Sequence, residues 1–461
     1  MFTPTWIKEQ SLLAVVALAL VLRLALWLIV PEAYAELDEL DYFAAGQRLA
    51  ERGEQDTYWP PVTGWLMALS IQLAGSSLSR VRLIWILMDL VNVVLVYRLA
   101  GRVRDALRDV SSARLAPHLP WLAALFHALY LPALSYSHFA TSETPALLLG
   151  LTVLLLITRA PGLSSTYAVC AGVVAGLLVL TRVNFALCLV VFPVALAATG
   201  TKRRPLLVFA GAAMLVVVAW AARNAAVWGD LVISRHSALN FSMGNQEVVQ
   251  GELNLFAPVA NAQQIEKRRK SQERAKSGAR TPGSMLDAPF PESKVLIGKG
   301  LQQIAHDPLC FLSRVVSRLG RLTVPRTRQL ELIGGEQRAD LASAPALLLL
   351  GAGALQWLFL LVCGTAGLVG MRRLAPHLVT LFAAYIASAV LLCLLAVSRP
   401  RYTYPFDPLL AIAALAFAID FRACRARIRK GERFSLLGLL VFYGWAWIAW
   451  AIFSLSSRAT S

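Results

Sequence analysis

Long apolar runs separated by short polar segments fill the chain from residue 12 to residue 453. As a helix, a run of about 20 apolar residues crosses the roughly 30 Å hydrocarbon core of a bilayer. The runs predict about eleven transmembrane helices, at residues 12–30, 81–99, 121–139, 144–157, 168–180, 185–198, 206–227, 344–369, 378–397, 406–421 and 436–453. The fourth, fifth and sixth runs are short for a full crossing. The pattern therefore predicts an all-α polytopic membrane protein with a single transmembrane domain over residues 1–461.

Composition and charge support a membrane protein and indicate its orientation. The chain is 57% hydrophobic and 15% charged, which is more apolar than a soluble domain can hide. Its formal net charge of +17 is concentrated in four short basic loops, at residues 98–114, 202–204, 372–373 and 422–433. With the predicted spans, all four lie on the same side as the N-terminus, which the positive-inside rule makes cytoplasmic. The basic charge therefore indicates topology and argues against a nucleic-acid partner.

The same topology places two larger loops on the outer side, at residues 31–60 and 229–343. Within the second, residues 252–299 combine a charge run with a stretch rich in Gly, Pro and Ser, which predicts a partly flexible segment. The six cysteines are scattered, without the spacing of a disulfide framework or a metal site. No cofactor is indicated, and dependence on a divalent metal stays open.

An acidic cluster directly follows the first apolar run. Residues 35–42 read AELDELDY and begin a predicted short amphipathic helix that ends near Arg52. Carboxylates crowded at a bilayer surface repel one another and the anionic headgroups, so hydropathy alone does not favour them. A site that activates a hydroxyl group outside the membrane needs such a cluster, whereas the alternative is a solvated loop that orients the first span. Asp38, Glu39 and Asp41 are the candidate catalytic residues, with Asp38 the favoured base and Asp41 its alternative.

Further ionisable side chains recur at the outer ends of the predicted spans, among them His138, Glu143, Arg182 and Arg401. Charges at a membrane boundary are costly and usually face a cavity or a partner. Guanidinium groups match phosphate geometry, and carboxylates can accept a proton from an attacking hydroxyl. The alternatives are ion pairs with the acidic groups for both arginines, a helix cap for Glu143 and a plain hydrogen-bonding role for His138.

Three polar residues lie inside predicted spans rather than at their ends. Asp89 and Asn92 belong to the second span, and Arg23 lies deep in the first. Polar side chains at such positions pair between helices, because lipid offers them no partner. We therefore expect Asp89 and Asn92, and likewise Arg23, to pair with groups on other helices.

Six segments, in this order, resemble those of the GT-C superfamily of membrane glycosyltransferases, in particular its protein-mannosyltransferase and aminoarabinose-transferase-like branch. The similar segments are residues 38–45 (DELDYFAA), Pro60 with Pro61, 136–143 (YSHFATSE), 171–182 (AGVVAGLLVLTR), 240–245 (NFSMGN) and 401–408 (RYTYPFDP). The chain departs from the family pattern at residues 237–239, where Ser-Ala-Leu replaces the usual doubled glycine.

The resemblance implies a GT-C-like bundle with extracytoplasmic juxtamembrane helices and the activity of a glycosyltransferase. The implied reaction moves a sugar from a polyprenyl-phosphate donor to an acceptor on the outer side of a bacterial inner membrane, with inversion. Asp38 would be the base, and Arg401 with Arg182 would hold the leaving phosphate. The remaining implied substrate-binding residues are His138, Glu143, Asn240, Asn245 and Tyr402. The implied partners are the lipid-linked sugar, membrane lipids and an acceptor that is a protein, a lipid or a polysaccharide.

A transporter or flippase of lipid-linked sugars is the alternative function. Such a protein would place its functional charges near the bilayer midplane and would show related half-repeats. The candidate residues instead gather at one predicted membrane face, which favours the transferase.

Overall fold

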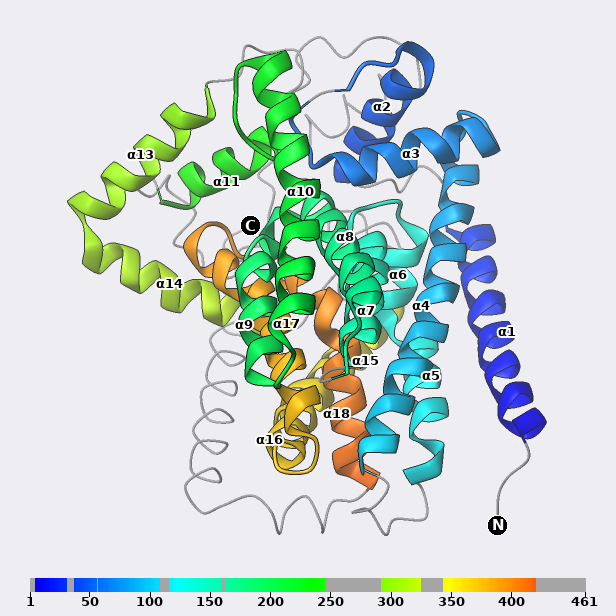
Figure 1. Ribbon diagram of the computed structural model, residues 1–461. Coiled ribbons are helices and arrows are strands. Elements are labelled where there is room, and N and C mark those ends of the chain that lie inside the picture. The colour runs from blue at the N-terminus through cyan, green and yellow to red at the C-terminus, as the bar shows by residue number, and fades with distance from the viewer. Residues whose placement is uncertain are drawn as a thin grey trace.

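The computed structural model describes residues 5–30, 37–55, 57–107, 116–159, 162–245, 292–324 and 343–419. Throughout these ranges the regular structure is helical (Figure 1), so the all-α prediction is confirmed. Residues 252–291, the basic loop 422–433 and the predicted last span at 436–453 lie outside the described residues.

Six stretches of helix are long and apolar enough to cross a membrane. They are α1 (Thr5–Ile29), α4 (Leu78–Leu107), α10 (Arg203–Trp228), α15 (Ala344–Phe359) continued through the π-helical turn η5 (Leu360–Gly364) and α16 (Thr365–Met371), α17 (Pro376–Leu395), and the 3-10 turn η6 (Pro400–Phe406) continued by α18 (Asp407–Ile419). These helices establish an integral membrane protein.

The other predicted spans within the described residues are bent or short. The third is α5 (Leu119–Leu129) followed by α6 (Leu131–His138), with a bend of 58° between them. The next three correspond to α7 (Glu143–Ile157), α8 (Ser165–Thr181), and α9 (Cys188–Ala198) after the 3-10 turn η3 (Val183–Phe185). At 1.5 Å per residue, the 15 residues of α7 extend only about 22 Å. The described residues thus hold six spans, or seven with the bent pair, and a count of eleven is not confirmed.

Five helices that are not among these spans gather at one end of the bundle (Figure 1). They are α2 (Leu37–Arg52), α3 (Pro61–Ala74), α11 (Arg235–Asn245), α13 (Ser293–His306) and α14 (Pro308–Thr323). The predicted helix ending near Arg52 is α2. Helix α3 starts at Pro61, where the fixed φ of proline suits the first helical turn.

A buried ion pair joins the first two spans, which agrees with the expectation that Arg23 and Asp89 pair between helices and identifies each as the partner of the other. Arg23 Nε on α1 donates to Asp89 Oδ2 on α4 at 2.7 Å, and both side chains are fully buried. His127 Nε2 on α5 lies 3.3 Å from Asp89 Oδ1. Arg23 also donates to the carbonyl of Ala128 at 3.3 Å, whose usual helical donor is missing because residue 132 is a proline. One guanidinium thus neutralises a buried carboxylate and satisfies the backbone where the α5–α6 bend begins.

Close packing of α8 against α10 depends on glycines. A Cβ atom at Gly172 would overlap the carbonyl oxygen of Phe209, and one at Gly176 would lie 2.7 Å from Cβ of Val216. Small residues let transmembrane helices approach until their backbones are in contact. These two glycines therefore set the distance between α8 and α10, beside the α8 terminus that carries Arg182.

We expect Gly172→Ala to destabilise the protein by about 1–3 kcal/mol, the usual cost of overpacking. The contact is with backbone, so α10 must shift to relieve it. Gly211→Ala on α10 is the matched control, because a Cβ there meets nothing within 4 Å. Thermal unfolding of both purified variants checks the prediction, and an equal melting temperature for the two would contradict it.

Candidate functional site

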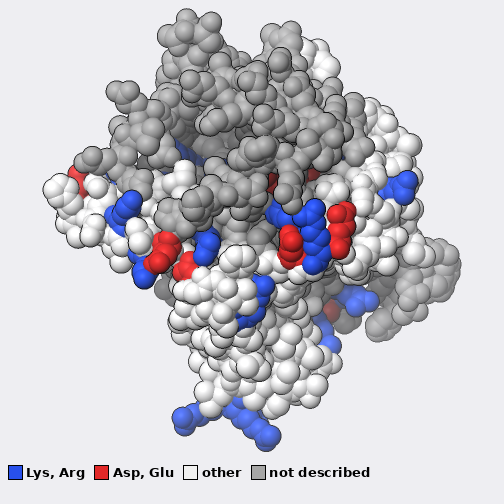
Figure 2. Space-filling model, turned by 90° about the horizontal axis from the view of Figure 1, so that it is seen from above, with Lys and Arg blue, Asp and Glu red and all other residues white. Residues whose placement is uncertain are grey.

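A cavity of about 240 Å³ opens at the bundle end that carries α2 and α11. Acidic and basic side chains lie next to one another on this end of the molecule (Figure 2). The charged and polar groups lining the cavity include Asp38, Arg182, His236, Asn240, Arg401 and Tyr402. Its apolar wall includes Trp59, Phe241, Leu392, Leu395 and Val397. Segments from residue 38 to residue 402 therefore converge on one space that both charged and apolar side chains line.

Asp38 and Arg401 form an ion pair at this cavity. Arg401 donates to Asp38 Oδ2, with 17% and 22% of the two side chains exposed. Asp38 lies in the first turn of α2, where the helix dipole favours a negative charge. Burial alone would raise the pKa of Asp38, but the charges of Arg401 and Arg399 outweigh it and hold that pKa well below its ordinary value. Asp38 is therefore an anion at neutral pH, available to accept hydrogen bonds.

Glu143 connects Arg401 to Arg182. Arg182 lies 2.7 Å from Glu143 Oε1 and donates to the hydroxyl of Ser142 at 3.1 Å. Nε of Arg401 lies 3.7 Å from the same carboxylate oxygen. The guanidinium of Arg182 also faces the ring of Tyr402, 5.1 Å from its centroid. Two carboxylates and two guanidiniums thus alternate in a chain of ion pairs, the arrangement that the sequence left open as an alternative. Asp38, Arg401 and Arg182 line the cavity, whereas Glu143 does not.

Glu39 occupies a different environment from its neighbour Asp38. Both of its carboxylate oxygens accept from Arg82 on α4, at 2.9 and 2.8 Å. Oε1 also accepts from the backbone N–H of Ala140 at 2.7 Å. His138 lies against the same guanidinium, with Nε2 3.3 Å from Arg82 NH1. This fully buried group holds α2 against α4 and against the segment that leads to Glu143, while neither Glu39 nor His138 lines the cavity.

The other predicted site residues divide in the same way. Asn240 and Tyr402 line the cavity, whereas Asp41 and Asn245 do not. The amide of Asn245 donates to the carbonyls of Phe241 and Leu395, both at 2.9 Å. Asn245 therefore ties α11 to the end of α17, which supports the apolar wall without reaching into the cavity.

The lining residues that were not predicted site residues include three with aromatic rings, Tyr42, Trp59 and His236. The ring of Trp59 lies 4.2 Å from that of His236 and 4.8 Å from that of Tyr42, measured between centroids. Burial lowers the pKa of His236 to about 4, so this imidazole is neutral at neutral pH. Trp59 directly precedes the Pro60–Pro61 step, but nothing in the pattern linked His236 to it.

No described group of three or more His, Cys, Asp or Glu side chains is arranged to hold a metal ion. The charged groups at the cavity are instead carboxylates already opposed by guanidiniums. Such an arrangement suits a ligand that carries a phosphate, because that phosphate can replace a carboxylate at the arginine.

A family model described as dolichyl-phosphate-mannose-protein mannosyltransferase matches residues 59–222, a little over a third of the chain. The match includes Trp59, Glu143 and Arg182, and it leaves Asp38 and Arg401 outside. No curated protein matches the sequence.

The solved structures that this chain matches include proteins from two organisms. The oligosaccharyltransferase of Archaeoglobus fulgidus in the apo form is 15% identical, with a TM-score of 0.49 over 98% of this chain and 57% of that chain. The AglB oligosaccharyltransferase of the same organism, in complex with an inhibitory peptide and a dolichol-phosphate, is 17% identical, with a TM-score of 0.46 over 98% and 56%. ArnT from Cupriavidus metallidurans bound to undecaprenyl phosphate is 14% identical, with a TM-score of 0.39 over 88% and 77%. The chain spans a little over half the length of the two oligosaccharyltransferase chains.

The family match and the sequence motifs agree where they overlap. The Pro60–Pro61 step, the 136–143 segment and the 171–182 segment all lie within residues 59–222. The resemblance of this chain to the GT-C superfamily of membrane glycosyltransferases is therefore confirmed, through the mannosyltransferase family that matches residues 59–222.

Proposed function

We propose that this protein transfers a sugar from a polyprenyl-phosphate donor to an acceptor hydroxyl at the Asp38 cavity. The observation that carries the proposal is the ion pair of Asp38 with Arg401 in a cavity that also has an apolar wall. The carboxylate can take a proton, the guanidinium can bind a phosphate, and the apolar side chains can contact a lipid.

A lipid-linked sugar phosphate fits both the charged and the apolar side chains that line the cavity. Guanidinium groups bind phosphate oxygens through paired, charge-assisted hydrogen bonds, and Arg401 and Arg182 both reach this space. Phe241, Leu392 and Leu395 offer an apolar surface for the first isoprene units. The description of the matching family names dolichyl phosphate mannose as donor, which supports the same class of donor here. The sugar and the acceptor are not specified by these residues.

In the proposed reaction, the acceptor hydroxyl gives its proton to Asp38 while its oxygen attacks the anomeric carbon. The bond from that carbon to the phosphate oxygen breaks, and polyprenyl phosphate leaves with the bonding electrons. A single displacement of this kind inverts the anomeric centre. A carboxylate near the anomeric carbon also stabilises the oxocarbenium-like transition state, as in glycoside hydrolysis.

The Asp38–Arg401 pair suggests how donor binding prepares the base. While Arg401 contacts Asp38, the pKa of that carboxylate is low, and a weak base accepts a proton poorly. When Arg401 turns to the donor phosphate, its charge offsets the effect of burial on Asp38 less strongly. The pKa of Asp38 therefore rises. The carboxylate would then become a better base when the leaving group is in place.

The cavity is proposed to face the extracytoplasmic side of a bacterial inner membrane, with the N-terminus in the cytoplasm. The basic residues at 98–104 and 202–204 support this orientation through the positive-inside rule, because they lie at the opposite ends of α4 and α10 from the cavity. A transporter gains less support, since the opposed charges of the cavity lie at one end of the bundle.

Removing Arg401 tests the proposed phosphate contact. Arg401→Ala should reduce the use of the donor about tenfold to a hundredfold, because a hydrogen bond to a charged group contributes about 1.5–3 kcal/mol. Arg401→Lys should restore only part of the donor use, since an ammonium group lacks the planar, two-pronged geometry of a guanidinium. The measurement is transfer of radiolabelled sugar from a panel of polyprenyl-phosphate sugars into an envelope fraction from a strain lacking the protein.

Arg399→Ala is the matched control, because Arg399 is an exposed neighbour on the same segment and does not line the cavity. It should change transfer much less than Arg401→Ala. Arg401→Ala should also shift the acid limb of the pH–rate profile to higher pH. The pKa of Asp38 should rise in this variant, because the charge that lowers it most has been removed. Equal donor dependence in the two variants would rule out the phosphate role of Arg401.

A further inference from the structure

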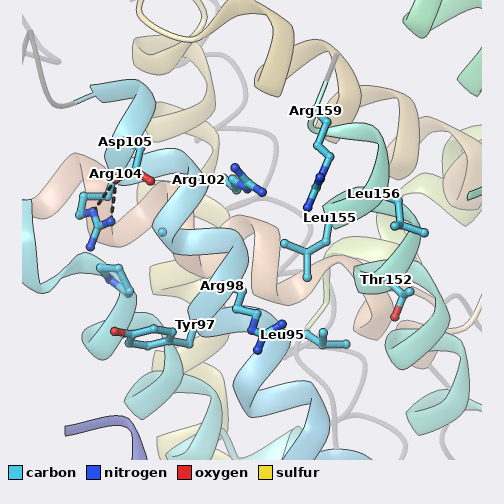
Figure 3. A pocket seen from close by; sticks show the side chains of 12 residues that line it. Leu95, Tyr97, Arg98, Arg102, Arg104, Asp105, Thr152, Leu155, Leu156 and Arg159 are labelled. Atoms are coloured by element: carbon cyan, nitrogen blue, oxygen red, sulfur yellow. Dashed lines mark hydrogen bonds and ion pairs between the residues drawn. The ribbon is translucent and has the colours of Figure 1, made fainter. Parts of the chain in front are cut away.

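A second hollow lies at the other end of the bundle, between α4 and α7. Its volume is about 500 Å³, and Figure 3 shows the side chains that surround it. Arg98 on α4 is sixteen positions after Arg82, whose guanidinium contacts Glu39 near the Asp38 cavity. At 1.5 Å per residue, this is about 24 Å along the helix. The two spaces therefore belong to opposite membrane faces.

Arginines dominate the charge of this hollow. Arg98, Arg102 and Arg104 come from α4, and Arg159 directly follows α7. Among the described lining residues the one carboxylate is Asp105, which accepts from its neighbour Arg104 at 2.9 and 2.6 Å. The guanidinium of Arg159 lies over the ring of Tyr167, 4.0 Å from its centroid, and this contact fixes its position. Two exposed arginines and one stacked arginine thus face a space with little opposing charge.

Apolar side chains continue the hollow towards the membrane interior. Leu95 lies about one turn deeper than Arg98 on α4, and Leu155 lies about one turn deeper than Arg159. Leu156 also lines the space, and all three leucines are half-buried. Positive groups near the surface and leucines below them match the order of an anionic phospholipid, whose headgroup lies at the surface and whose chains run inward.

Gly101 keeps this space open. A Cβ atom at Gly101 would meet nothing within 4 Å, although the residue lies in α4 between Arg98 and Arg102 and lines the hollow. Glycine in a helix costs about 1 kcal/mol relative to alanine, and no close helix contact at this position explains it. The missing side chain leaves room next to two guanidinium groups.

We propose that this hollow binds an anionic phospholipid of the adjacent leaflet, with the headgroup phosphate held by Arg98, Arg102 and Arg159 and an acyl chain against Leu95 and Leu155. General attraction of basic residues to an anionic leaflet requires no particular shape. A specific lipid-binding site, in contrast, requires both the arginines and the open volume at Gly101. Variants that change the charge or the volume separately can therefore distinguish the two kinds of binding.

The test measures binding of phosphatidylglycerol to the full-length protein in phosphatidylcholine nanodiscs that contain a small fraction of fluorescent phosphatidylglycerol. The double variant Arg98→Gln/Arg102→Gln should bind it about thirtyfold more weakly, since each such arginine contributes about 1 kcal/mol near anionic headgroups. Gly101→Leu should also weaken binding at least about tenfold, because it fills the space while leaving every charge and adding no clash at Cβ.

Arg203→Gln/Arg204→Gln is the matched control. These exposed arginines begin α10 at the same end of the bundle and do not line the hollow. The control should bind phosphatidylglycerol like the unmodified protein. An equal loss in the control, or normal binding by Gly101→Leu, would overturn the proposal in favour of general surface charge. Complete displacement of the lipid by inorganic phosphate would also overturn it, because the site would then take a free anion without needing the acyl chain.

Discussion

Asp38→Asn is expected to lower sugar transfer by about a hundredfold to ten-thousandfold, the usual contribution of a general base. Asparagine has nearly the same shape as aspartate, but it cannot accept the proton of the attacking hydroxyl. The side chain is partly exposed and lies at the edge of the cavity, so the protein should still fold and insert. The assay is transfer from polyprenyl-phosphate sugar by purified protein, with the melting temperature of each variant recorded alongside.

Asp41→Asn is the matched control for this experiment. Asp41 lies one turn further along α2 and does not line the cavity, so its replacement should have a smaller effect. Substantial activity in Asp38→Asn would show that Asp38 is not the base, and Asp41 would become the next candidate. Full activity in both variants would exclude a carboxylate mechanism on this helix and would weaken the proposed function itself.

The sequence predicted the helical class, the acidic helix α2 and the pairing of Arg23 and Asp89 between helices, although not their pairing with each other. These features depend on local signals: the length of apolar runs, the crowding of carboxylates and the cost of a charge in lipid. The number of crossings was harder to predict. An apolar helix such as α7 or α3 has the composition of a span without the length of one. The α5–α6 bend depends on Pro132, which leaves the Ala128 carbonyl without its helical donor, and on Arg23, which donates to that carbonyl instead.

The pairing of the site residues could not be predicted from spacing alone. Asp38 and Glu39 are adjacent in sequence and equally acidic, yet successive helical residues point about 100° apart. Asp38 therefore faces the cavity and Arg401, whereas Glu39 faces Arg82 inside the bundle. Which carboxylate meets which arginine depends on how α2 is rotated against α4, and that rotation is a property of the packed structure.

Arg82→Met is expected to destabilise the protein by about 3–5 kcal/mol, the usual cost of removing one partner from a buried ion pair. Both side chains of the Arg82–Glu39 pair are essentially inaccessible to solvent. Without the guanidinium, the Glu39 carboxylate keeps its hydrogen bond from the backbone of Ala140 but loses the charge that balances it. The melting temperature of the purified protein should fall accordingly.

A double-mutant cycle separates this ion pair from a general packing defect. Glu39→Gln alone leaves Arg82 buried without its carboxylate, while Gln can still accept from the Ala140 N–H. The double variant Arg82→Met/Glu39→Gln contains no unpaired charge at this position, so it should be more stable than Arg82→Met. If the stability losses of the two single variants simply add in the double variant, the two side chains are not coupled. A higher melting temperature of the double variant than of Arg82→Met would show that Glu39 and Arg82 act as a pair. This pair holds α2 in the rotation that presents Asp38 to Arg401, which explains why the two adjacent carboxylates need different partners.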